Sequence, residues 1–261
     1  MKLHHFSALA FSFAIVAAHG VAQAGPITFS ESTCQSGKAE ADAFTCTTKV
    51  PGSNQTATAT ASAWSAPTDG KFATASIGYF PSAGLGIIAK NETSAGSQHA
   101  IDNKGGTDAF LINFGSSNFA LNQISIGWRD TDADVSILRY TGATSPFLGN
   151  STVANLDNAA GWDWVGNYST LATSSILNFN NEGTVKTAAW WLVSAYNSAY
   201  TGVPASGSLN NANDYFKING FGGNLATVTP PANDVPEPGT FALFGIALLG
   251  FAAARRKFQS K

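Results

Sequence analysis

The sequence predicts an all-β fold, a single β-sandwich domain of jelly-roll-like form. Gly, Ser, Thr, Ala and Asn dominate its composition, and only 11% of its residues are charged. Apolar residues occur in short runs separated by Gly, Asn or Pro, which is typical of short strands joined by turns. Between two apolar terminal segments lie about 210 residues, enough to bury one sizeable core.

Side-chain alternation predicts the individual strands. Residues 56–64 alternate small apolar and hydroxyl side chains and predict an exposed strand, although this low complexity also suits an O-glycosylated or flexible stretch. Apolar residues at 110, 112 and 114, and again at 124, 126 and 128, predict half-buried strands. Residues 188–196 are apolar on both faces, which predicts a central strand. Further strands are predicted at 135–140, 162–168, 175–179 and 215–219.

The amino-terminal residues predict a cleaved secretory leader. Lys2 is followed by an apolar run over residues 6–21 and then by Ala22-Gln23-Ala24, small residues of the kind that signal peptidase recognises. We expect the leader to comprise residues 1–24 and the exported domain to comprise residues 25–234. The alternative, a buried helix, has no predicted helical partner in the chain.

The carboxyl-terminal residues 235–261 form three zones. A Val235-Pro236-Glu237-Pro238 motif precedes fourteen uncharged residues, 241–254, and a basic tail, 255–261, begins with Arg255-Arg256-Lys257. At about 1.5 Å per residue the uncharged helix would cover roughly 21 Å of a hydrocarbon core about 30 Å thick, a marginal span. The basic residues should stay cytoplasmic, so the residues before Pro236 would lie outside the inner membrane. The alternative is a permanent single-span anchor.

This tail resembles the PEP-CTERM sorting signal of Gram-negative bacteria, which the membrane protease exosortase recognises. The matching residues are the four of the motif, the apolar stretch and the three basic residues. Proline lacks a backbone N–H and restrains the residue before it, so the motif should stay extended and open to a protease. The resemblance implies signal peptidase and exosortase as partners, transient contact with the inner membrane, and a final place at the cell surface or in the extracellular matrix.

A second resemblance covers roughly residues 44–221. That region resembles one family of exosortase-dependent surface proteins, a likeness that implies display by bacteria that make exopolysaccharide but supplies no catalytic residues. The likeness rests on a series of short stretches: GLGI (84–87), Glu92, HAIDN (99–103), DAFLINF (108–114), IGW (126–128), DADVSILRYTG (132–142), GWDWVGNY (161–168), WWLVSAYN (190–197) and DYFKI (214–218).

Charge and cysteine content agree with export. Residues 25–238 contain nine basic and sixteen acidic side chains, a net charge of −7, which argues against nucleic acid as a partner but allows a neutral polysaccharide. Cys34 and Cys46 are the only cysteines. We expect them to form a disulfide in an oxidising compartment, with free thiols as the alternative.

The sequence gives little support to an enzyme. His99 is the only histidine after the leader, and neither G-x-S-x-G nor H-E-x-x-H occurs. Paired carboxylates of a glycosidase stay open, because their separation is a property of the fold.

Acidic residues suggest one structural calcium ion at most. The set Glu92, Asp102, Asp108 and Asp214 is the better candidate, by analogy with jelly-roll modules in which an early loop meets the last strand. His99 is expected to be a hydrogen-bonded loop residue, since calcium prefers oxygen ligands. The alternative for Asp102-Asn103 and Asp108 is a turn and a strand-end cap. The run Asp130-Thr-Asp132-Ala-Asp134 lacks the Gly and Glu of an EF-hand and is interpreted as a solvated hairpin tip.

Two tryptophans are the candidates for carbohydrate contact. Trp162 and Trp164 should point to the same face of a strand, where an exposed pair could stack on sugar rings, although core packing is favoured. The sequence therefore predicts a non-enzymatic surface or matrix protein associated with exopolysaccharide or biofilm. The alternative is a carbohydrate-binding module for a neutral polysaccharide.

Overall fold

The structure is a computed structural model of the chain. It describes residues 25–34, 39–68, 70–90, 92, 99–156, 159–169, 171–200, 208–210 and 213–226. The predicted leader and the predicted sorting segment lie outside these residues. Within them, no helix is long and apolar enough to cross a membrane.

Strands make up almost all the regular structure of the described residues. The first seven are β1 (Ile27–Ser30), β2 (Glu40–Ala41), β3 (Ala43–Lys49), β4 (Thr56–Pro67), β5 (Ala73–Phe80), β6 (Gly84–Ile88) and β7 (Ile101–Asp102). The others are β8 (Gly106–Asn113), β9 (Phe119–Thr131), β10 (Val135–Tyr140), β11 (Trp162–Tyr168), β12 (Ile176–Asn178), β13 (Trp190–Ala195) and β14 (Asp214–Leu225). The helical elements are single turns: η1 (Glu31–Thr33), η2 (Leu148–Asn150) and α1 (Val153–Leu156).

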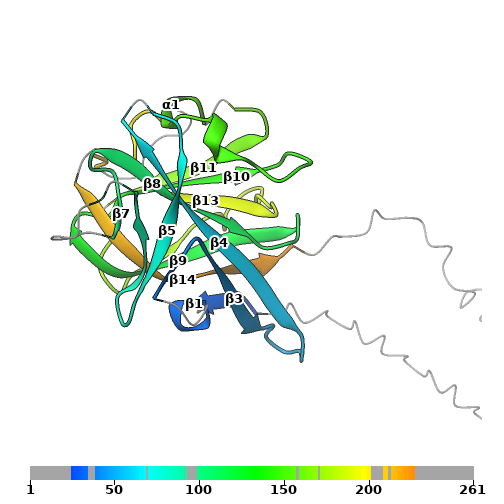
Figure 1. Ribbon diagram of the computed structural model, residues 1–261. Helices are drawn as coiled ribbons and strands as arrows, with labels where there is room; N and C mark the ends of the chain where they lie inside the picture. The colour runs from blue at the N-terminus through cyan, green and yellow to red at the C-terminus, as the bar shows by residue number, and fades with distance from the viewer. Residues whose placement is uncertain are drawn as a thin grey trace, which may run out of the picture.

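The strands form one curled antiparallel sheet. Its order is β11-β10-β13-β8-β4-β5-β6-β14-β9-β12, with β1 and β7 paired to β14, β2 to β5 and β3 to β4. We call β11, β10, β13, β8, β4 and β3 the upper half of the sheet, and β6, β14, β9 and β12 the lower half. The first residues of β5 pair with β4 and the later ones with β6, so β5 belongs to both halves. Figure 1 shows β10, β11 and β13 in the upper half and β9 and β14 below them. The all-β prediction is confirmed, whereas the jelly-roll connectivity stays a prediction.

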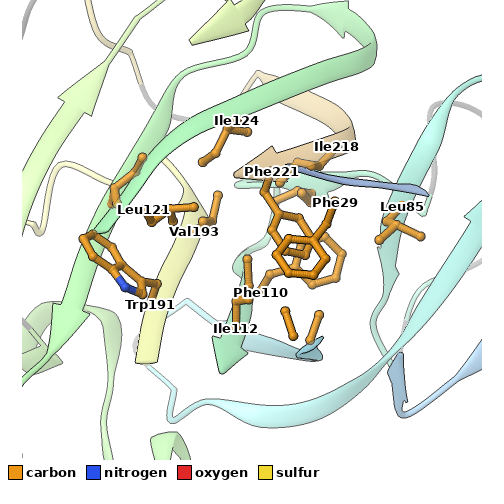
Figure 2. Packing of buried hydrophobic residues seen from close by; sticks show 14 of the residues in the cluster. Phe29, Leu85, Phe110, Ile112, Leu121, Ile124, Trp191, Val193, Ile218 and Phe221 are labelled. Atoms are coloured by element: carbon orange, nitrogen blue, oxygen red, sulfur yellow. The ribbon is translucent and has the colours of Figure 1, made fainter. Parts of the chain in front are cut away.

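The main core lies where the two halves face each other. Phe110 and Val193 from β8 and β13 point toward Ile124 and Phe221 from β9 and β14 (Figure 2). Phe29 of β1 stacks on Phe221 with ring centroids 5.3 Å apart. Burial of each large apolar side chain stabilises the folded state by about 1.5 to 3 kcal/mol. The packing of these side chains therefore holds the two halves of the curled sheet together.

A second core covers the outer face of the upper half. Leu111, Leu138 and Leu192, from β8, β10 and β13, pack there against Leu148 and Leu156 of the segment that joins β10 to β11. Strands β8 and β13 are therefore buried on both faces. This confirms the predicted central strand at 188–196, and it corrects the prediction of a half-buried strand at 110–114, because Leu111 fills the outer face.

Two predicted strands, β10 and β11, have the predicted bounds, but the strand at 56–64 is not exposed. Ala59, Ala61 and Ala63 of β4 lie in the main core, while Thr56, Thr58 and Thr60 face solvent. β4 pairs with β3 on one side and with β8 on the other. Small side chains are buried here because β4 lies between two paired strands and the alanine face of β4 packs in the main core.

The predicted disulfide is present. Cys34, directly after η1, is bonded to Cys46 of β3, and both cysteines are buried in the main core. The bond closes a loop of twelve positions and ties the β1–η1 segment to β3. On the loop-entropy account such a crosslink stabilises the folded state by about 3 kcal/mol.

Candidate functional site

Three aspartates meet between the halves of the sheet. Asp132 and Asp134 lie in the link from β9 to β10, and Asp214 begins β14. Their ligand oxygens lie within 4.8 Å of one another. We call these three residues the acidic centre.

The acidic centre corrects the hairpin-tip interpretation. β9 pairs with β12 and β14 in the lower half, while β10 pairs with β11 and β13 in the upper half. The link between β9 and β10 therefore crosses from one half to the other instead of turning back at the surface. As a result Asp134 and Asp214 are 0% exposed and Asp132 is half-buried, whereas Asp130, two residues before Asp132, is exposed.

Backbone contacts fix the geometry of the acidic centre. Asp132 and Asp214 form an isolated parallel bridge, and the Tyr215 N–H donates to the Asp132 carbonyl at 3.1 Å. The Tyr196 N–H donates to the Asp134 carbonyl at 2.9 Å. The link is thus bonded to β14 through Asp132 and to the residue that follows β13 through Asp134.

The carboxylates accept hydrogen bonds from backbone and amide groups. Asp214 Oδ1 accepts from the Asp134 N–H at 2.7 Å, and its Oδ2 accepts from Asn103 Nδ2. The Asp214 N–H donates to Asn103 Oδ1 at 3.1 Å, so these two residues are joined twice. Asn210 donates its backbone N–H to Asp134 and its side-chain amide to Asp132, each at 2.9 Å.

Burial dominates the electrostatics of the acidic centre. It raises the pKa of Asp214 to about 7; the Asp134 N–H bond lowers that pKa, the charges of Asp134 and Asp132 raise it, and the Asn103 bond lowers it. Among the described residues no lysine or arginine forms an ion pair with Asp214. A cation bound here would supply the missing positive charge, and an all-oxygen donor set suits Ca²⁺.

The predicted calcium set is divided between two places. Asp102 of β7 lies opposite Tyr215 of β14, and neighbouring residues of a strand point to opposite faces. Asn103, not Asp102, therefore reaches Asp214. Among the described residues Glu92, Asp102 and Asp108 form no metal-sized group with Asp214. The prediction that the region around residue 102 meets the start of β14 holds, but a neighbouring residue makes the contact.

Glu92 organises the loop before β7. Its carboxylate accepts the His99 N–H at 2.6 Å and the Ala89 N–H at 3.1 Å. His99 Nδ1 lies 3.5 Å from Glu92 Oε2, and the ring stacks on Phe80 at 6.0 Å. His99 thus occupies a hydrogen-bonded loop position, in a left-handed backbone conformation with φ of 61°.

Asp102 is half-buried and Asp108 is buried, and both carboxyls have raised pKa values. Burial raises the pKa of Asp102 to about 6; the bond from the Lys104 N–H opposes this, and the charge of Glu92 adds to it. Burial also raises the pKa of Asp108 well above its usual value, with the Asp102 charge adding to the rise and the Ser65 hydroxyl opposing it. These two groups therefore hold protons more strongly than exposed aspartates do.

Lys217 is a buried cation held between rings. Its Nζ lies 4.0 Å from the centre of the Trp128 ring and 4.7 Å from that of Phe80. Burial lowers the pKa of Lys217, while the charge of Glu92 raises it. The ring contacts join β5, β9 and β14, so Lys217 has a structural role.

The tryptophan candidates are not an exposed pair. Both face the second core, as the spacing predicted, and Trp164 is only 6% exposed, with Tyr200 5.3 Å away. Trp162 is half-buried and packs on Tyr140 at 5.2 Å. Core packing, the favoured prediction, is confirmed for Trp164.

The sorting residues Val235, Pro236, Glu237, Pro238, Arg255, Arg256 and Lys257 lie outside the described residues. Comparison with known families supports them: residues 234–257 match the family model described as the PEP-CTERM protein-sorting motif. No curated protein and no solved structure matches the chain. The chain therefore carries a PEP-CTERM sorting signal after a curled antiparallel β domain.

Proposed function

We propose that this protein is a non-enzymatic surface or extracellular-matrix component of a Gram-negative bacterium, processed by exosortase and associated with exopolysaccharide or biofilm. The observation that carries the proposal is the PEP-CTERM match at residues 234–257, since that motif directs proteins to exosortase and the cell surface.

Two features of the domain are suited to a protein that functions outside the cytoplasm. The Cys34–Cys46 disulfide is the kind of bond that persists in oxidising compartments. The net charge of −7 over residues 25–238 disfavours nucleic acid and leaves neutral polysaccharide as an acceptable neighbour. Export would begin with removal of residues 1–24 by signal peptidase.

The tail would act during sorting. In this proposal residues 241–254 span the inner membrane transiently, with Arg255, Arg256 and Lys257 on the cytoplasmic side. Exosortase would then cut near Pro236-Glu237-Pro238 and release the domain of residues 25–234, a jelly-roll-like sandwich, to the outside.

The absence of an enzymatic role is also part of the proposal. His99, the only histidine after the leader, packs against Glu92 and Phe80 and has no serine or cysteine partner among the described contacts. Both cysteines are used in the disulfide. A surface or matrix role needs a stable domain, and the two cores and the disulfide support that need.

The alternative function is a carbohydrate-binding module. Trp162 and Trp164 do not favour it as a pair, because Trp164 is buried and packs against Tyr200. A structural calcium ion stays compatible with either function, and the acidic centre offers it a tighter oxygen cluster than the set predicted from sequence.

Intact-mass analysis of the protein recovered from the cell surface tests the proposal. The expected mass is that of a chain without residues 1–24 and without the tail after the motif. It is about 2 Da below the mass of the same processed chain with reduced cysteines, because the disulfide lacks two hydrogens. The double variant Pro236→Ala/Pro238→Ala should keep its tail, whereas Asn233→Ala, upstream of the matched stretch, should be processed normally. Recovery of the uncut, reduced chain inside wild-type cells would overturn the proposal.

A further inference from the structure

A pocket opens on the face of β7 that is opposite the acidic centre. It has a volume of about 450 Å³ and lies between the end of β4, the start of β5, the segment after β6 and the turn from β7 to β8. This size falls within the range of about 300 to 1,000 Å³ typical of small-molecule sites. We call it the β4–β8 pocket.

Three carboxyl groups and two ammonium groups line the pocket. Glu92, Asp102 and Asp108 provide the carboxyls, and the exposed Lys90 and Lys104 provide the cations. With opposite charges this nearly balanced, the pocket offers no strong field that would select an ion of either sign. Its polar groups are instead a mixed set of hydrogen-bond donors and acceptors.

The carboxyl groups are held in place before any ligand arrives. Two backbone N–H groups fix Glu92, and the Lys104 N–H donates to Asp102 Oδ1 at 3.0 Å. Asp108 is only 5% exposed and is hydrogen-bonded to the Ser65 hydroxyl. Because a carboxyl group has about four acceptor positions, each of the three keeps capacity for a ligand. Such fixed groups lower the entropy lost on binding.

Glycines leave the rim of the pocket open. Gly105 has φ of +75°, and a Cβ atom placed there would meet nothing within 4 Å. At Gly106 there is no room for a side chain, since a Cβ atom placed there would lie 2.7 Å from the Ala66 carbonyl oxygen. The turn from β7 to β8 therefore presents bare backbone beside Asp102 and Asp108.

The geometry disfavours two simple ligands. A single metal ion needs its ligand oxygens close together, yet the acidic centre is the only such group in the described part of the chain. A polyamine would meet the two lysines at the rim. A hydroxyl group, which donates one hydrogen bond and accepts two, suits carboxyl, hydroxyl and ammonium groups equally.

We propose that the β4–β8 pocket binds a neutral polyhydroxylated ligand, one or two residues of an uncharged saccharide. The pocket lining supports this, because Glu92 and Asp102 present oxygens that can accept from sugar hydroxyls. Burial, which raises the pKa of Asp108, favours the protonated form of that carboxyl, which can donate to a sugar oxygen. The pocket thus gives carbohydrate contact a location different from Trp162 and Trp164. Binding here does not depend on tail processing, so failure of this inference leaves the sorting proposal intact.

The test is titration of the full chain with glucose, galactose, mannose and N-acetylglucosamine, followed by calorimetry and NMR. At least one sugar should bind with a dissociation constant of about 1 mM or tighter. Asp102→Asn should weaken binding tenfold or more, and Thr74→Trp, which fills the pocket from an exposed lining position, should abolish it. Asp130→Asn, an exposed aspartate outside the pocket, is the matched control.

Three results would overturn the inference. One is no binding by any of the four sugars to a chain whose unfolding transition is intact. Another is binding that Thr74→Trp and Asp102→Asn leave unchanged. The third is a preference for spermidine or CaCl₂ that Asp102→Asn removes, which would show that the pocket selects cations.

Discussion

Carboxyl groups gather on both sides of β7, buried in the acidic centre on one side and lining the β4–β8 pocket on the other. On one face, Asn103 joins the acidic centre, where two carboxylates are fully buried and hydrogen-bonded to backbone and amide groups. On the other face, Asp102 shares a pocket with Glu92 and Asp108. Asp102, the last residue of β7, therefore belongs to an open site, and Asn103, which follows it, belongs to a closed one.

This difference separates carboxylates whose hydrogen bonds lie within the fold from carboxylates that line a pocket. In the acidic centre the acceptors are used to join the β9–β10 link to β14, so their loss should weaken the fold. In the β4–β8 pocket part of the acceptor capacity of the carboxyl groups faces the pocket. Loss of one of these groups should therefore weaken ligand binding more than it lowers the free energy of unfolding. The predictions below test this contrast, beginning with the largest effect.

Removing the central carboxylate of the acidic centre should cost the most stability. Asp214→Ala leaves the buried Asp134 N–H without its acceptor and removes the Asp214 bonds of Asn103, whose amide keeps the Tyr196 carbonyl at 2.8 Å. We expect the free energy of unfolding to fall by about 3 kcal/mol. Urea denaturation of the full chain measures this loss. Asp130→Ala, exposed in the same segment, should change stability by less than about 0.5 kcal/mol. Equal effects of the two variants would contradict the contrast.

Calcium should stabilise the acidic centre but not act through the pocket. At pH 8 the Asp214 carboxyl is ionised, and an ion at one hundred times its dissociation constant adds about 2.7 kcal/mol. Thermal unfolding with CaCl₂ or EGTA should show this as a higher midpoint with calcium. Asp132→Asn should remove the shift, whereas Asp102→Asn should keep it. If the calcium-dependent shift of the midpoint were lost only in Asp102→Asn, the ion would bind in the β4–β8 pocket and the prediction would be wrong.

In calcium-free buffer, pH should change the stability contributed by Asp214. Its folded-state pKa of about 7 exceeds the ordinary value of 3.8, so the folded chain binds more protons between these values. The contribution of Asp214 is therefore most favourable below about pH 4 and falls as pH rises to 7, by about 1.4 kcal/mol for each pH unit in the middle of that range. The stability of wild type minus that of Asp214→Asn, followed against pH, measures it. A flat or rising difference would refute the assignment.

The smallest effect should come from the pocket. Asp102→Asn removes a carboxylate whose pKa is raised to about 6 but keeps an oxygen for the Lys104 N–H. We expect the melting temperature at pH 7.5 to rise by only about 1 to 2 °C. Asp130→Asn provides the baseline for a surface charge. A fall of several degrees would mean that Asp102 holds the fold together as Asp214 does.

Sequence patterns predicted the parts of the fold that depend on local alternation. The apolar stretch at 188–196 is the central strand β13, and Cys34 and Cys46 are bonded. Strands built from alanine and glycine were harder to detect: β4 was expected to be exposed, and β5 and β6 were not predicted. At Gly84 and Gly86 of β6 the backbones of Ile218 and His99 leave no room for a Cβ atom, and apolar alternation does not indicate such a contact.

The candidate sites show the same limit. Pairing of β7 with β14 brings residues 101 and 102 to residues 216 and 215, as the grouping of Asp102 with Asp214 anticipated. Which neighbour reaches Asp214 was decided by strand phase, which puts Asn103 on that face. The inclusion of Asp132 and Asp134 had a local signal, an alternating run of aspartates, but their burial required the link to cross between the halves.

By itself, the sequence determined the sorting motif at the carboxyl terminus, the all-β class and the disulfide, because each depends on residue type and short spacing. Only the tertiary structure decided which acids are buried together and which face a pocket. Those outcomes depend on strand register and on the curl of the sheet, and contacts between residues about a hundred positions apart set both.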